Sequence, residues 1–105
     1  MMLSFELRNK ADWRQAFMLP TTDLTGAALR MRLGTLYLST SNGRIVIDDP
    51  TVGAFSFVVP AADLNTVQPG HYRVDLLMFQ PGKVKTVFAG SIDVVTDETN
   101  PVSYL

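Results

Sequence analysis

Short runs of alternating hydrophobic and polar residues fill most of this chain. Between residues 27 and 33, for example, Leu29, Met31 and Leu33 alternate with arginines, which is the period of a strand with one buried face. The other runs that we interpret as strands span residues 3–7, 13–19, 36–38, 44–47, 54–59, 72–78 and 84–95. Because turn residues separate these runs, the pattern predicts an all-β fold, an antiparallel β-sandwich of seven to nine short strands.

The residues between the runs predict how the strands connect. Asn42-Gly43 accepts the positive φ angles of a tight hairpin turn, so we expect the strands on its two sides to pair. Gly34 marks a bend or bulge, and Gly90 marks an interruption of the last strand. Residues 60–64 have the pattern of a short helical turn that crosses between two sheets.

A corner between the sheets is predicted at the start of the run over 72–78. Pro69 and Gly70 set a turn, and Tyr72 lies just inside the following strand. In the corner of an immunoglobulin-like sandwich, such a tyrosine buries its ring while its hydroxyl binds backbone upstream. Gly70 and Tyr72 are therefore interpreted as structural corner residues that stabilise the fold.

Composition fits one domain, residues 1–105, with a polar C-terminal tail over 97–105. Hydrophobic residues make up 47% of the chain and charged residues only 18%, so we expect part of the surface to be covered in an assembly. Nine basic and ten acidic residues are scattered along the sequence, which argues against nucleic-acid or membrane binding. The N-terminus lacks the features of a signal peptide, so synthesis in the cytoplasm is expected.

No catalytic, metal-binding or cofactor-binding site is predicted. The absence of cysteine excludes disulfides, thiolate metal sites and cysteine nucleophiles. His71 is the only histidine, and without a nucleophile motif it is best explained as an exposed residue at a turn. Asp48 and Asp49, alone or with Glu98, invite a calcium or glycosidase interpretation, but Asp-Asp-Pro after a strand is also ordinary turn chemistry, which we prefer.

Four arginines project from the predicted strands: Arg30, Arg32, Arg44 and Arg73. Cross-strand ion pairs with Asp75 or Asp93 on a solvated outer face would account for them. A basic ligand site is the alternative.

Three hydrophobic residues are candidates for a contact between subunits: Leu77, Phe79 and Trp13. Leu77 and Phe79 alternate with the core residues Leu76 and Met78, so we expect them on the outer face of a central strand. The alternative is that strand twist or a loop covers them. Trp13 would serve an interface or stack on a sugar, although a lone tryptophan more often packs inside the protein.

Taken in order, several landmarks along the chain resemble those of a known family. They are Asp-Trp at 12–13, Asp-Leu-Thr-Gly-Ala at 23–27, Leu-Ser-Thr at 38–40, Asn-Gly-Arg-Ile at 42–45, Gly-Ala-Phe at 53–55, Gly-His-Tyr-Arg-Val-Asp-Leu at 70–76 and Gly-Ser-Ile-Asp-Val at 90–94. This series is similar to small immunoglobulin-like structural proteins of tailed bacteriophages and prophages, including the N-terminal domain of baseplate upper proteins.

The resemblance implies a non-enzymatic virion component. It would act in a tail or baseplate, or as a fibre adaptor, by binding other virion proteins and as a homo-oligomer, with no cofactor. Two alternatives are a capsid decoration protein of the same fold and a small carbohydrate-binding module that uses Trp13, Tyr37 and loops at one end of the sandwich. A hydrolase built on carboxylates is a more remote third hypothesis.

Overall fold

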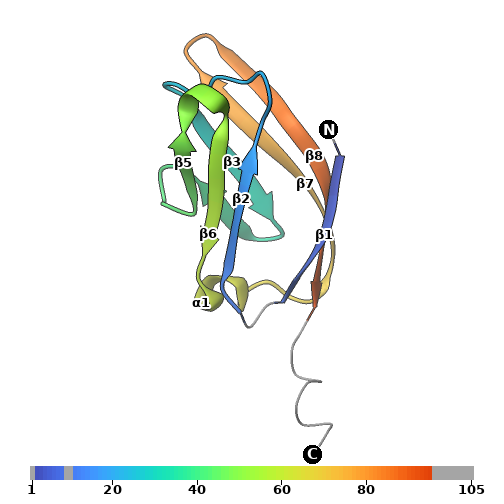
Figure 1. The fold of residues 1–105 in the computed structure, drawn as a ribbon. Coiled ribbons are helices and arrows are strands. Elements are labelled where there is room, and N and C mark those ends of the chain that lie inside the picture. Colours follow the sequence, from blue (N-terminus) through green and yellow to red (C-terminus); the bar gives the residue numbers. More distant parts are fainter. Residues whose placement is uncertain (1, 9–10, 96–105) are drawn as a thin grey trace, which may run out of the picture.

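Within residues 2–8 and 11–95, eight strands are arranged in two facing sheets (Figure 1). A computed structural model describes residues 2–8 and 11–95, except for the side chains of residues 2–5, so the predicted tail over 97–105 lies outside the described residues. In chain order the elements are β1 (Met2–Arg8), β2 (Trp13–Met18), β3 (Ala28–Leu33), β4 (Leu36–Ser39), β5 (Ile45–Asp49), the 3-10 helix η1 (Pro50–Val52), β6 (Ala54–Val59), α1 (Ala61–Leu64), β7 (Gly70–Gln80) and β8 (Lys83–Val95). The predicted all-β sandwich is confirmed.

The strand order is that of an immunoglobulin-like sandwich. One sheet has the order β1-β8-β7-β3-β4, and the other has the order β2-β6-β5. By position, β3, β7 and β8 correspond to strands C, F and G of that fold, while β2, β6 and β5 correspond to B, E and D. One pair departs from the expected antiparallel arrangement, because β1 runs parallel to β8.

The core lies between the sheets and is built from the inward row of each strand. Leu29, Met31 and Leu33 are all at most 2% exposed, as the alternation predicts. From the smaller sheet, Phe55 and Phe57 are completely buried and pack edge to face, with ring centroids 5.6 Å apart. Aromatic contacts of this geometry stabilise a core by more than the burial of their apolar surface alone would.

The prediction of a hairpin at Asn42-Gly43 is wrong. Residues 40–44 connect β4 in the larger sheet to β5 in the smaller one, so these two strands are not neighbours. The Asn42 side chain organises the crossing instead: its Oδ1 accepts the backbone N–H groups of Ser39 and Arg44 at 3.1 and 3.0 Å. The hairpin lies one connection earlier, where β3 pairs with β4 and Leu33 opposes Leu36 across Gly34.

The last strand is also more continuous than predicted. The β7–β8 ladder runs through Gly90, which opposes Val74, without interruption there. The irregularity lies at Val87, which has no partner because Leu76 opposes Phe88 while Leu77 opposes Thr86. The predicted helical turn is present as α1, which carries the chain from the smaller sheet to the larger one.

The predicted corner forms at the start of β7. The hydroxyl of Tyr72 donates a hydrogen bond to the carbonyl of Gln68 at 2.6 Å, and the ring packs against the core from a partly buried position. The ring also lies against Gly34, where an added Cβ would come within 2.9 Å of Tyr72 Cε1. The corner therefore ties β7 to the β3–β4 hairpin as well as to its own turn.

Candidate functional site

The candidate site is the solvent-facing side of the larger sheet, which we call the outer face. Leu77 opposes Arg30 and Phe79 opposes Ala28 in the β3–β7 ladder, so these side chains share that face. Leu77 and Phe79 are half-buried while their neighbours in β7 point into the core, which confirms that they project away from it. Their predicted role in an interface stays a prediction.

Two exposed hydrophobic side chains extend the apolar part of the outer face. Tyr37 on β4 is 49% exposed and opposes Arg32. Val84 on β8 is 62% exposed and opposes Phe79. Apolar side chains contributed by β4, β7 and β8 therefore lie on one side of the sheet, and clusters of this kind mark contact surfaces.

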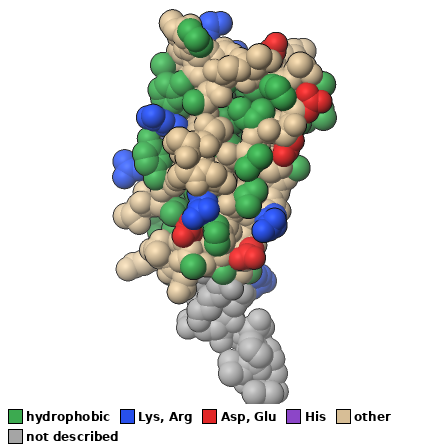
Figure 2. Space-filling model, turned by 90° about the vertical axis from the view of Figure 1, so that its left-hand side faces the viewer, with side chains coloured by type: hydrophobic (Ala, Val, Ile, Leu, Met, Phe, Trp, Pro, Cys, Tyr) green, Lys and Arg blue, Asp and Glu red, His purple; other side chains and the backbone are tan. Residues whose placement is uncertain are grey.

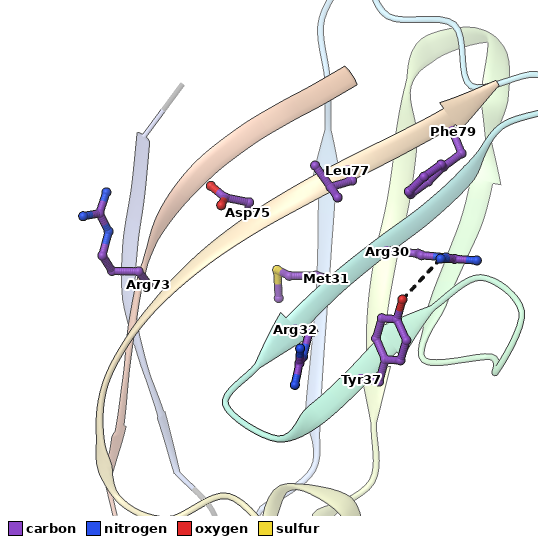
Figure 3. A pocket seen from close by; sticks show the side chains of 8 residues that line it. All are labelled: Arg30, Met31, Arg32, Tyr37, Arg73, Asp75, Leu77 and Phe79. Atoms are coloured by element: carbon purple, nitrogen blue, oxygen red, sulfur yellow. Dashed lines mark hydrogen bonds between the residues drawn. The ribbon is translucent and has the colours of Figure 1, made fainter. Parts of the chain in front are cut away.

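A slot opens in the outer face where β3 and β7 separate (Figure 3). The ladder between these strands pairs only Ala28–Arg30 with Leu77–Phe79, although both strands continue beyond it. Figure 3 shows the strands diverging toward Arg32 and Arg73, with Met31 between them. The cavity there has a volume of about 340 Å³.

Aromatic rings hold one of the slot's cations in place. The Arg30 guanidinium carbon lies 4.9 Å from the centroid of the Phe79 ring, and its Nη1 donates to the Tyr37 hydroxyl at 3.3 Å (Figure 3). A cation above an aromatic face gains electrostatic stabilisation from the ring. Tyr37 and Phe79 thus fix the orientation of the Arg30 side chain.

The expected ion pairs with Asp75 and Asp93 do not form. Arg44 pairs instead with Asp63 of α1, with Nε and Oδ2 2.5 Å apart. Asp93 pairs with His71, which opposes it on β7, at 2.5 Å between Oδ1 and Nδ1. Asp75 has no ion pair in residues 2–8 and 11–95. Register explains the two strand residues, because Asp93 lies opposite His71 whereas Asp75 lies opposite Ala89, and such neighbours cannot be read from spacing along the chain.

Trp13 is not a surface residue, so the interface and sugar-stacking interpretations of it are wrong. Its side chain is 5% exposed and stacks on Phe57 with ring centroids 4.5 Å apart. Its indole N–H donates to Gln15 Oε1 at 3.0 Å. Trp13 lies opposite Val59 in the β2–β6 ladder, and both side chains face the core.

The acidic residues considered for metal binding or hydrolysis are engaged locally. Asp48 accepts a hydrogen bond from the Ser56 hydroxyl at 2.6 Å, and Asp49 caps η1 through the backbone N–H of Thr51. Within the described part of the chain, no cluster of three or more His, Asp or Glu side chains is placed to hold a metal ion. Glu98 lies outside the described residues.

One carboxyl group has a shifted pKa. Hydrogen bonds from the side chain and backbone of Thr25 hold the pKa of Asp23 below its ordinary value of 3.8. This carboxylate closes the turn between β2 and β3 through the Thr25 N–H at 2.9 Å. The shift therefore belongs to a turn and does not indicate an acid–base catalyst.

Sequence reasoning located Leu77 and Phe79 but missed the slot beside them. The strict alternation of β3 and β7 shows which residues face outward, whereas the point at which the two strands separate is not marked in either sequence. The view in Figure 2 shows hydrophobic side chains spread among charged side chains of both signs. None of the helices in the described ranges is long and apolar enough to cross a lipid bilayer.

Comparison with known proteins supports the fold and goes no further. No family model matches the chain, and no curated protein matches it in sequence. One similar solved structure is an endo-β-1,4-mannanase from Thermotoga petrophila, with a TM-score of 0.59 and 14% sequence identity. The match covers 89% of this chain but only 18% of the mannanase chain, so the chain spans less than a fifth of that protein's length. At this identity the likeness shows a shared sandwich fold.

Proposed function

We propose that this chain is a non-enzymatic structural module of a bacteriophage particle, which acts in the tail, the baseplate or a fibre adaptor by binding other virion proteins. The observation that supports an assembly role is the set of hydrophobic side chains on the outer face, with half-buried Leu77 and Phe79 beside exposed Tyr37 and Val84. Interface cores are enriched in aromatic residues and arginine, which are the residue types gathered here.

The placement in a phage particle rests on the resemblance of the chain's landmarks to small phage proteins. Sheet edges offer a second means of assembly, because an edge strand has unpaired backbone groups that another chain can bind. The edges in this fold are β1 and β4 in one sheet and β2 and β5 in the other. Homo-oligomers formed through these edges belong to the same proposal.

Two measurements test the proposal. Antibodies raised against the chain should label purified particles of a phage whose genome encodes it, and the labelled position separates a tail role from capsid decoration. Particles that contain none of the chain would refute the phage proposal. Light scattering of the purified protein, alone and mixed with solubilised particle proteins, then measures assembly directly.

A matched pair of variants locates the contact. Phe79→Asp places a charge on the outer face, and Val46→Asp places the same charge at a 41%-exposed position on the smaller sheet. We expect Phe79→Asp to abolish assembly while Val46→Asp preserves it, with circular dichroism showing that both variants are folded. Equal behaviour of the two variants would remove the outer face from the proposal.

A carbohydrate-binding module is the second candidate, and exposed Tyr37 beside the slot is the observation that favours it. The similar mannanase chain motivates mannan oligosaccharides as the first ligands to titrate. Binding that Tyr37→Ala abolishes would support this candidate. Calorimetric titrations without a binding signal would exclude these sugars.

A further inference from the structure

The slot in the outer face carries more positive than negative charge. Three arginines and one carboxylate line it: Arg30, Arg32, Arg73 and Asp75. In the part of the chain that the structure describes, none of these four groups contacts an oppositely charged side chain, because the acid–base contacts found there join Arg44 to Asp63 and His71 to Asp93. The planar guanidinium group matches the geometry of a carboxylate, so this face has unused capacity to bind anions.

This charge argues against a second copy of the chain as the occupant. A symmetric pair built through the outer face would bring the same surface patch of both molecules together. Six arginines would then be opposed by only two aspartates, and like charges brought together at an interface are repulsive. The face is therefore suited to a partner of opposite charge.

The apolar part of the slot indicates the kind of group that enters it. Leu77 and Phe79 line the slot from β7, and the 2%-exposed Met31 lines it from β3 where the two strands separate. A shallow cavity of about 340 Å³ with aliphatic and aromatic walls suits an apolar side chain from outside. Arg30, held by Tyr37 and Phe79, lies at the rim of this cavity, ready to bind a carboxylate next to that side chain.

We propose that the slot docks an acidic segment of a partner protein, in which Asp or Glu residues flank an apolar side chain. The apolar side chain enters between β3 and β7, and the flanking carboxylates bind the slot arginines. This inference rests on the proposed assembly function and names the chemistry of the partner.

The test uses the full chain, immobilised, and a display library of random peptides as the probe. We expect selected peptides to be rich in Asp and Glu next to Leu or Phe. A synthetic peptide from this selection should bind at least about tenfold more weakly to Arg32→Ala or Arg73→Ala, and more weakly as salt is raised. The double variant Arg32→Glu/Arg73→Glu should select basic peptides, whereas Arg14→Glu, an exposed change on β2, should select the same acidic peptides as the unaltered protein.

Each other outcome overturns the inference in a distinguishable way. Neutral apolar peptides that require Leu77 would refute the acidic partner but leave the assembly function standing. Peptides that bind regardless of Leu77 and Phe79 would refute the outer face as a docking surface altogether. A galacturonic acid oligosaccharide that binds through Arg32, when no peptide does, would point to an acidic sugar. A dimer in light scattering that Leu77→Asp dissociates would assign the face to a second copy.

Discussion

Replacement of Gly53 by alanine should destabilise this protein strongly, and the structure separates two causes of the loss. Gly53 is buried at the end of η1 with φ +72°, a left-handed conformation. A Cβ at this position would lie 2.3 Å from the carbonyl oxygen of Leu19 and 2.8 Å from that of Thr22. Both contacts are with backbone, so relief requires the β2–β3 connection to move.

The two costs can be estimated one at a time. The left-handed conformation costs a residue with a Cβ about 1–2 kcal/mol. Forcing extra volume into a packed site adds roughly 1–3 kcal/mol. The Gly53→Ala change should therefore lower the free energy of unfolding by about 2–5 kcal/mol, a large part of the roughly 5–15 kcal/mol typical of a small domain.

Gly43→Ala is the matched control. Gly43 has φ +80°, yet no atom beyond its two chain neighbours lies within 4 Å of where an added Cβ would stand, so only the conformational cost of about 1–2 kcal/mol applies. Urea unfolding, followed by circular dichroism, measures both variants on the same scale. Equal losses of stability in the two would refute the argument from backbone crowding at Gly53, because the crowding is the one cost that they do not share.

Three further predictions concern the corner, the core and a turn. Tyr72→Phe should lower the free energy of unfolding by about 1 kcal/mol, because it removes the hydrogen bond to the Gln68 carbonyl. Tyr37→Phe, at an exposed site, should lower it less, and equal stabilities of the two variants in thermal unfolding would contradict this prediction. Trp13→Ala should cost about 3–5 kcal/mol in urea unfolding because it empties a buried site, and an unchanged midpoint would place the indole at the surface. The lowered pKa of Asp23 means that its ionised form stabilises the fold above pH 3.8 and that this contribution is lost as pH falls through the folded pKa. NMR titration should show a smaller shift in Thr25→Ala, which loses the side-chain hydrogen bond but keeps the backbone one, and an unshifted Asp23 in the unaltered protein would refute this reasoning.

The candidate site was only partly accessible to sequence reasoning. Alternation with Leu76 and Met78 was enough to place Leu77 and Phe79 on an outer face, since strand side chains alternate by geometry alone. The same reasoning did not place Trp13, because a residue at the start of a strand is buried or exposed according to which sheet covers it. Stacking of Trp13 on Phe57 joins residues far apart in the chain.

Local patterns in the sequence determined the strands, their inward faces and the corner at Tyr72. Each of these depends on residues close together in the chain: the alternation along a strand, the residues of a turn, and a tyrosine hydroxyl that binds a carbonyl four residues earlier. Only the tertiary structure decided which strands pair. Asn42-Gly43 has the local chemistry of a hairpin, yet the chain crosses between sheets there, since burying the inward rows of β4 and β5 in different sheets outweighs the preference of one turn. The tertiary structure likewise decided the slot between β3 and β7, on which the proposed docking depends. The slot exists because the two strands separate, and where they separate depends on the core side chains packed beneath them.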